Sequence, residues 1–296
     1  MRQLRIRRLG DFRCQVGEGP LWDERAQRLY FVDLVGRRLC RFNPVDERFE
    51  HWDMPETIAA LALTESGVVV VALADAFYSF DPATQALVLL ARAALPQGAQ
   101  FNDGKVDRSG RFVAVSMERT MKVPLGGIYR LGAGRVETLE SGYVIGNGPC
   151  WSIDGKTFYC SDSIPRTIYA YDYGAGALSN RRVFAETGAL GGIPDGATVD
   201  ASGQMWMAIC GAGKIAAFAG DGTVARVIDM PTRWVSSVMF GGPGLDRLYV
   251  PSLDPTLVGL PPDEHAGYLY VIEDLDARGV VEPRLRLEGK QEEGAT

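Results

Sequence analysis

A short segment recurs six times along the 296-residue chain at nearly constant spacing, and this repeat limits the folds that the chain can adopt. Each copy combines a small or polar opening, a turn and an apolar run. The copies begin at Gly17, Ile58, Phe101, Gly146, Pro194 and Val235. Their second residues are separated by steps of 41, 43, 45, 48 and 41 residues. A period of this length with short β-rich units is typical of a β-propeller.

The turn inside each copy predicts a β-hairpin. Five positions after each second residue stand Asp23, Thr64, Asp107, Ser152, Asp200 and Gly241. Short polar side chains bond the local backbone of a turn, and the glycines nearby permit positive φ. A third strand is predicted after most hairpins, and a fourth is predicted in five of the copies. The sixth copy lacks a clear fourth strand, which residues 4–12 (LRIRRLGDF) are expected to supply.

These patterns predict an all-β fold: a six-bladed β-propeller with four-stranded blades and a ring closed by the N-terminal strand. Closure removes the free sheet edges that promote aggregation. A β-sandwich is the alternative, and six turn-matched copies at regular spacing disfavour it. Residues 1–288 are expected to form this single propeller domain, and the polar tail 289–296 is expected to be disordered.

Composition excludes several classes of partner. The net charge is -6 and no basic stripe is present, which disfavours nucleic acid. No apolar run is long enough to span a bilayer, and the basic opening segment lacks the apolar stretch of a secretion signal. The five cysteines form no CxxC pair, which favours reduced thiols. We therefore expect a cytoplasmic monomer or weak homo-oligomer, without nucleic-acid or membrane partners.

The second position of the repeat carries carboxylate or amide side chains in four copies. These residues are Glu18, Asn102, Asn147 and Asp195. If each begins the innermost strand of its blade, the four side chains surround the channel mouth. Hard oxygen ligands of this kind suit Ca²⁺, Mg²⁺ or Mn²⁺. Only two histidines occur, so a histidine metal site or a Ser-His-Asp triad is disfavoured.

Each of these residues also has a purely structural interpretation. Asn102 in Asn-Asp-Gly, Asn147 in Gly-Asn-Gly-Pro and Asp195 in Pro-Asp-Gly all stand in turn-prone sequences. Glu18 lies between two glycines, an unusual setting for a solvated surface charge. The shared position in one repeat favours ligation over four unrelated turns.

Four motifs, in order along the chain, resemble those of the SMP-30/gluconolactonase/regucalcin-like family of six-bladed propellers. They are GEGPLWD, FNDGKVDRSGRF, GNGPCWSIDGKTFYCSD and PDGATVDASGQMW. The resemblance implies one divalent cation in the central channel, held by Glu18, Asn147 and Asp195. It also places Asn102 and Asp103 at the substrate pocket.

Two positions depart from the pattern that the resemblance implies. Gln100 stands where members that act on aldonolactones commonly carry Arg, which removes a fixed fork of donors. Glu118 is the candidate for an acidic pocket residue that often follows the next strand.

The resemblance predicts a hydrolase that opens a small-molecule sugar lactone, with Asp195 as general base. Its cation is Ca²⁺, Mg²⁺, Mn²⁺, Zn²⁺ or Fe²⁺. The alternatives are hydrolysis of another lactone or ester at the same metal, or a non-enzymatic calcium-binding propeller.

Overall fold

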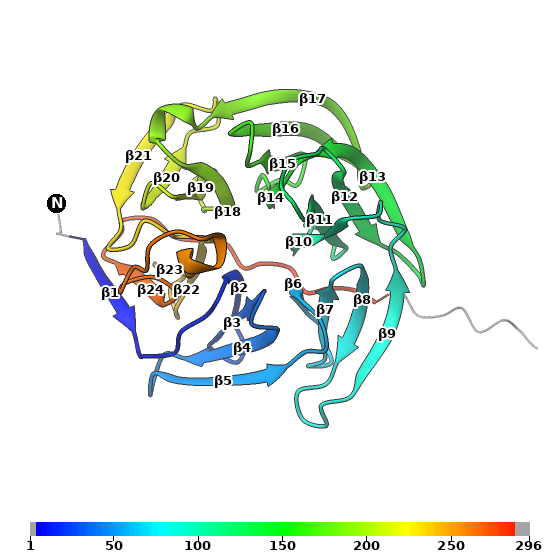
Figure 1. The fold of residues 1–296 in the computed structure, drawn as a ribbon, viewed down its shortest axis with the longest axis horizontal. Coiled ribbons are helices and arrows are strands. Elements are labelled where there is room, and N and C mark those ends of the chain that lie inside the picture. The colour runs from blue at the N-terminus through cyan, green and yellow to red at the C-terminus, as the bar shows by residue number, and fades with distance from the viewer. Residues whose placement is uncertain (1–3, 288–296) are drawn as a thin grey trace, which may run out of the picture.

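The computed structural model describes residues 4–287, which form six four-stranded sheets arranged as blades around a central axis (Figure 1). The first two blades contain β2 (Gly17–Asp23), β3 (Arg28–Asp33), β4 (Arg38–Asn43) and β5 (Arg48–Asp53), then β6 (Ile58–Leu63), β7 (Val69–Leu73), β8 (Ala76–Phe80) and β9 (Leu87–Arg92). The next two contain β10 (Ala99–Val106), β11 (Phe112–Glu118), β12 (Gly126–Leu131) and β13 (Val136–Tyr143), then β14 (Gly146–Trp151), β15 (Thr157–Asp162), β16 (Thr167–Gly174) and β17 (Ala177–Glu186). The last two contain β18 (Ile193–Val199), β19 (Met205–Cys210), β20 (Lys214–Phe218) and β21 (Val224–Asp229), then β22 (Met239–Gly241), β23 (Arg247–Val250), β24 (Leu269–Glu273) and β1 (Arg5–Leu9).

The N-terminal strand closes the ring, as the sequence predicted. β1 pairs antiparallel with β24, in a register that runs from Arg5 opposite Glu273 to Leu9 opposite Leu269. The six separate four-stranded sheets exclude the β-sandwich. The tail predicted to be disordered from residue 289 lies outside the described residues.

The predicted turn chemistry is present at the far face, the face where each innermost strand ends. Asp107 accepts hydrogen bonds from the backbone N–H groups of Ser109 and Arg111, and Asp200 accepts from those of Ser202 and Gln204. These side chains satisfy turn donors that the strands leave unpaired. The turns therefore fix the hairpin that begins each blade.

At the opposite face, aspartates at the end of the second strand of a blade accept hydrogen bonds from the backbone that leads into the innermost strand. Asp33, at the end of β3, accepts from the backbone N–H groups of Gln15 and Val16. Asp162, at the end of β15, accepts equivalently from Val144 and Ile145. We call this the mouth face, because the innermost strands begin here.

Apolar side chains fill the spaces between neighbouring blades. Trp151 and Phe158 of the fourth blade pack with Val113 and Val115 of the third, and all four side chains are buried. Burial of each large side chain contributes about 1.5–3 kcal/mol to folding. Side-chain packing therefore holds neighbouring blades together, while the strand ladders act within each blade.

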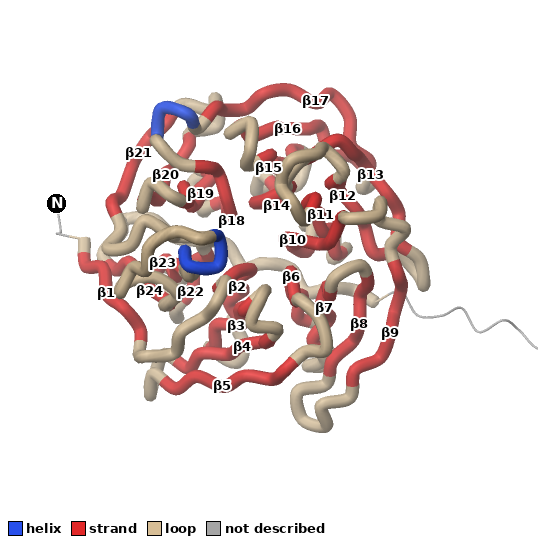
Figure 2. The backbone as a smooth tube through the Cα atoms, viewed as in Figure 1, coloured by secondary structure: helices blue, strands red, loops and turns tan. Residues whose placement is uncertain are grey.

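Two short 3₁₀ helices interrupt the all-β pattern among residues 4–287 (Figure 2). The first, η1 (Gly188–Leu190), precedes β18, and the second, η2 (Pro255–Val258), lies in the long loop between β23 and β24 at the mouth face. The sixth blade also departs from the predicted repeat, because its innermost strand begins only at Met239. Ser236 precedes that strand, and its carbonyl instead accepts the backbone N–H of Gly196 in the fifth blade.

Residues 275–287, which we call the C-terminal strap, cross the far face after β24 (Figure 1). The backbone of Arg278 accepts the N–H of Ala201 in the fifth blade. Further along, the N–H of Leu285 donates to Leu63 in the second blade, and that of Arg286 donates to Gly110 in the third. The strap therefore connects blades on opposite sides of the ring.

The described part of the chain contains no helix long and apolar enough to cross a membrane. All five cysteines are buried, and none forms a disulfide.

Candidate metal centre in the central channel

Five of the six innermost strands contain a β-bulge at or just after the second position of the repeat. The register shifts between Glu18 and Leu21, between Asn147 and Cys150, and between Pro194 and Ala197. The other two shifts, one in β6 and one in β10, fall at the same point. A bulge inserts an unpaired residue and redirects side chains. In these five blades the repeat therefore specifies a bend near the beginning of the innermost strand, which lines the central channel.

The bulge in β10 affects two neighbouring side chains that the sequence assigned to the pocket. Asn102 is the extra residue, because Phe101 pairs with Ser116 and Asp103 pairs with the next residue, Val115. Successive side chains of a regular strand point to opposite faces. The bulge removes that alternation, so the side chains of Asn102 and Asp103 both reach groups of the fourth blade.

Glycines permit the bends in β2 and β14. Gly19 and Gly148 adopt φ values of +50° and +57°, a region that disfavours side chains. At Gly148 an added Cβ would also lie 2.6 Å from the backbone oxygen of Asp195. The glycine in the GNGP motif is thus required for the fourth and fifth blades to approach each other.

A chain of hydrogen bonds orients the side-chain amide of Asn147. Its Nδ2 donates to Ser163 Oγ at 2.9 Å, and Ser163 Oγ donates to the Pro194 carbonyl at 2.8 Å. Its Oδ1 accepts from Nδ2 of Asn102 at 2.9 Å. Because Ser163 commits its proton to Pro194, it accepts from Asn147, and the amide oxygen is left facing Asn102.

Three carboxyl groups are buried near one another in the channel. Glu18, Asp103 and Asp195 are 5–6% exposed. Burial raises the pKa of Glu18 well above its usual value, and repulsion from Asp195 and Asp103 raises it further. Burial and the charge of Asp103 likewise raise the pKa of Asp195. The three carboxyl groups therefore resist being ionised together, and a bound cation would favour their ionised forms.

The donor set fits a hard divalent cation. Carboxylate and amide oxygens are the ligands that Ca²⁺, Mg²⁺ and Mn²⁺ prefer. Among residues 4–287, no group of three or more His, Cys, Asp or Glu side chains is arranged to hold a metal ion. The ligand set predicted from the sequence, Glu18, Asn147 and Asp195, has only two carboxylates and takes its third oxygen from an amide.

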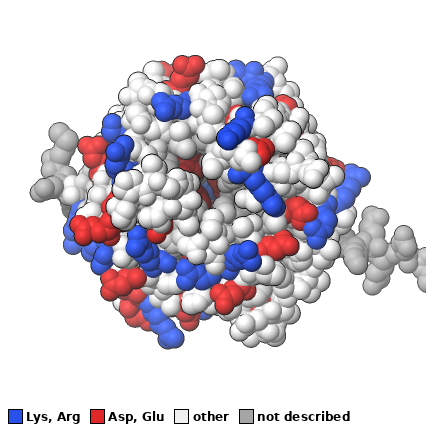
Figure 3. Space-filling model, in the orientation of Figure 1, with Lys and Arg blue, Asp and Glu red and all other residues white. Residues whose placement is uncertain are grey.

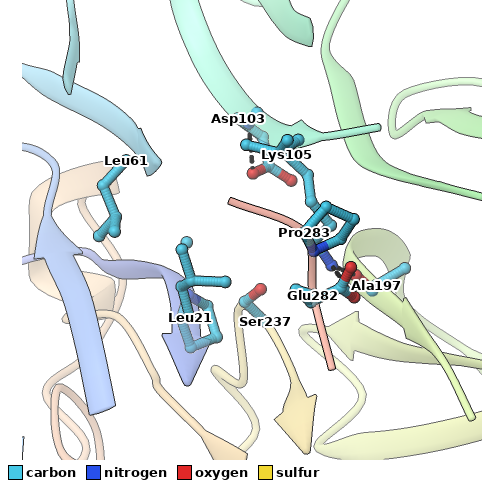
Figure 4. A pocket seen from close by; sticks show the side chains of 12 residues that line it. Leu21, Leu61, Asp103, Lys105, Ala197, Ser237, Glu282 and Pro283 are labelled. Atoms are coloured by element: carbon cyan, nitrogen blue, oxygen red, sulfur yellow. Dashed lines mark hydrogen bonds and ion pairs between the residues drawn. The ribbon is translucent and has the colours of Figure 1, made fainter. Parts of the chain in front are cut away.

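Asp103 is held by backbone donors and faces a cation of the protein itself. Its carboxylate accepts from the N–H groups of Gly104 at 2.6 Å and Gly148 at 3.0 Å. Burial raises its pKa to about 6, against the lowering effect of Lys105 and these hydrogen bonds. The Lys105 ammonium donates to the Ala197 carbonyl at 2.7 Å. Figure 4 shows Asp103 and Lys105 beside a small cavity bounded by Leu21, Leu61, Ser237 and Glu282.

The remaining predicted pocket residues lie nearer the mouth face. Gln100 is half-buried on β10, two residues before Asn102. Glu118, at the end of β11, accepts from the backbone N–H groups of Thr120 and Lys122 and from the Thr120 hydroxyl. These hydrogen bonds lower the pKa of Glu118 to about 2. In this structure the Glu118 carboxylate therefore organises its own loop.

The mouth face is hollowed at its centre, with acidic atoms in the floor of the hollow (Figure 3). The side of the hollow formed by η2 shows no charged side chains in this view. Leu257, Val258 and Leu260, in and after η2, are exposed, as are Met121 and Val123 in the mouth loop between β11 and β12. The approach to the site is therefore partly apolar.

Four residues close to the site did not emerge from the sequence. Ser163 and Glu282 stand outside the repeated positions and carry no sequence signal. Lys105 follows Asp103 by two residues on the same strand, a spacing that would have placed both on one face. Cys210, at the end of β19, is buried, and its thiol lowers the pKa of Asp195 against the larger effect of burial.

Comparison with known proteins adds a family context to this geometry. A model of the SMP-30/Gluconolactonase/LRE-like region matches residues 16–254. Regucalcin of Oryctolagus cuniculus is 32% identical over 281 residues, covering 90% of this chain and 93% of that protein. A solved luciferin-regenerating enzyme has a TM-score of 0.89 at 27% identity, covering 96% of this chain and 100% of that one. The calcium-binding protein regucalcin of Agrobacterium tumefaciens has a TM-score of 0.88 at 26% identity, covering 96% and 98%.

Proposed function

The chain belongs to the SMP-30/Gluconolactonase/LRE-like family, and on that basis we propose that it is a metal-dependent lactonase. The observation that supports the proposal is that Glu18, Asn147 and Asp195 each lie on the innermost strand of a blade, with the buried Glu18 carboxyl close enough to Asp195 for its pKa to be raised. The buried carboxyl groups of Glu18 and Asp195 repel each other when ionised, and a divalent cation would relieve that repulsion.

Glu18, Asn147 and Asp195 would hold the cation, whose identity stays open among Ca²⁺, Mg²⁺, Mn²⁺, Zn²⁺ and Fe²⁺. When bound, it would supply Lewis-acid polarisation of the lactone carbonyl. Asn102, Asp103 and Gln100 would orient the lactone by hydrogen bonding, since all three lie on β10. Glu118 would contribute by ordering the loop beside the pocket.

Asp195 would act as general base. Its carboxylate would take a proton from the water whose oxygen forms the new bond to the carbonyl carbon. The bond from that carbon to the ring oxygen then breaks, and the proton passes to the departing oxygen. The product is an open-chain hydroxy acid.

Hydrolysis of a panel of lactones, with and without chelator, tests this function. We expect glucono-1,5-lactone to be hydrolysed, activity to be lost with EDTA and restored by a divalent cation, and Asp195→Asn to be inactive. Asp221→Asn is the matched control, because Asp221 is an exposed turn residue of the same blade. A hydrolysis rate that EDTA does not change, or full activity in Asp195→Asn, would show that the proposal is wrong.

A second candidate substrate is a lactone or ester with an apolar substituent. The exposed apolar side chains of Met121, Val123, Leu257 and Val258 at the mouth favour it. Gln100 also offers fewer donors to sugar hydroxyls than the Arg expected there. Faster turnover of γ-decanolactone than of glucono-1,5-lactone would select this candidate. Tight Ca²⁺ binding without turnover of any lactone or ester would instead support a calcium-binding propeller.

The proposal places the protein in the cytoplasm, because all five cysteines are free and buried. Its partner would be the small-molecule substrate.

A further inference from the structure

The C-terminal strap inserts a carboxylate into the far end of the channel. Glu282 is 8% exposed, and its Oε2 accepts from Arg108 Nη1 at 2.8 Å. Its Oε1 lies 4.0 Å from the Lys105 ammonium and 3.4 Å from the Thr198 hydroxyl oxygen. Glu282 and Pro283 line the same cavity as Asp103 and Lys105 (Figure 4). The strap therefore closes the end of the channel opposite the mouth.

Lys105 connects this end of the channel with the candidate metal centre. Asp103 and Lys105 stand two positions apart on β10 after its bulge, and both side chains line the cavity. The lysine side chain is only 12% exposed. Its ammonium is held on one side by the Ala197 carbonyl and on the other by Glu282. A buried ammonium needs such partners to remain charged.

The charges of these groups can be counted. Glu18, Asp103, Asp195 and Glu282 contribute four carboxylates, and Lys105 and Arg108 contribute two cationic groups. When all six groups are ionised, as ligand carboxylates must be with a cation bound, two negative charges are left over, which is the charge that one divalent cation neutralises. Removal of Glu282 would leave one, and removal of Lys105 would leave three. Charges in a poorly hydrated channel interact more strongly than charges at the surface.

We propose that Glu282 is a positioning residue that adjusts divalent-cation affinity from the far end of the channel, by fixing and partly neutralising Lys105 beneath Asp103. This inference rests on the proposed cation site. It assigns to the strap an electrostatic role in the site, in addition to its packing against the blades.

Isothermal titration of the chelator-treated full chain with CaCl₂, at one fixed pH near neutrality, tests the proposal. Glu282→Gln keeps the size of the side chain and should weaken Ca²⁺ binding, whereas Lys105→Met should strengthen it. We expect each change to be about three- to tenfold in Kd. The double variant should return close to the wild-type Kd. Arg284→Met is the matched control, because Arg284 anchors the strap to Asp23 and Glu24 outside the cavity.

The opposite signs separate this role from a structural one. If Glu282 served only to hold the strap, Glu282→Gln and Lys105→Met would both weaken binding, and Arg284→Met would weaken it as well. That pattern, or an unchanged Kd in Glu282→Gln, overturns the inference. If the wild-type chain binds no divalent cation at all, the cation site itself is wrong. Thermal melting of each variant confirms folding, and Lys105→Gln replaces Lys105→Met if the latter does not fold.

Discussion

Asn102 donates its side-chain amide to Oδ1 of Asn147 over 2.9 Å, although 45 positions separate the two residues. The same Nδ2 group lies 3.0 Å from the Gly146 carbonyl. The third and fourth blades are thereby joined at the residue that we propose as a metal ligand. A group that orients a ligand affects metal affinity and activity without touching the metal.

We expect Asn102→Ala to lower kcat/KM for the preferred lactone by about 10–100-fold, because Asn147 loses the donor that fixes its oxygen. Steady-state kinetics at saturating cation measures the effect. Asn43→Ala is the control, since Asn43 serves a far-face turn of the first blade. Equal losses in the two variants would contradict a specific role for Asn102.

Ser163→Ala should weaken divalent-cation binding by about 10–100-fold, because the Asn147 amide is then free to rotate. Calorimetric titration measures the Kd. Ser152→Ala removes a hydroxyl from the far-face turn of the same blade, where Ser152 Oγ accepts from the Thr157 N–H. It should lower the melting temperature without changing the Kd. A Kd unchanged in Ser163→Ala would show that Asn147 needs no such support.

The raised pKa of Asp103 predicts a pH dependence of stability in the chelator-treated protein. Its pKa is about 6 in the folded chain against 3.8 for the free side chain, so the folded state binds more protons between these values. Stability should therefore fall as pH rises from about 4 to 6, by at most about 3 kcal/mol from this group. Urea unfolding across that range, compared with Asp103→Asn, isolates the contribution. Parallel curves for the two proteins would refute it.

Gly148→Ala should destabilise the fold and weaken cation binding together. The alanine would adopt an unfavourable φ of +57°, and its Cβ would press on the backbone of Asp195. Gly134→Ala is a control with φ of +69° and no atom within 4 Å of the added Cβ. It should cost about 1–2 kcal/mol through φ alone and leave the Kd unchanged. A Gly148→Ala variant no less stable than Gly134→Ala would contradict the required close approach.

The repeat predicted the fold and placed the site residues on the right strands, because a propeller turns a sequence period into a shared position around an axis. Glu18, Asn102, Asn147 and Asp195 each lie on an innermost strand for that reason. The sequence did not reveal the bulges that direct these side chains, because register depends on the partner strand. It also missed Glu282, which reaches the channel through a segment that follows the last repeat and obeys no period.

Ser236 shows where the period itself fails. Its backbone pairs with the fifth blade and with Pro251 instead of forming the strand that the sixth copy predicted. Sequence similarity between copies cannot reveal the hydrogen bond with Gly196, because Gly196 lies outside the sixth copy.

The pairing of β1 with β24 has a consequence for how the molecule comes apart. An open stack of repeats can unfold from either terminal repeat. Here β1 pairs with β24, so the first and last strands of the described chain belong to the same blade. The ring therefore has no terminal blade from which unfolding can begin. Unfolding of any blade breaks its packing against both neighbouring blades or the β1–β24 pairing. Heat or denaturant should therefore melt all six blades in one cooperative transition, with no partly assembled ring along the way.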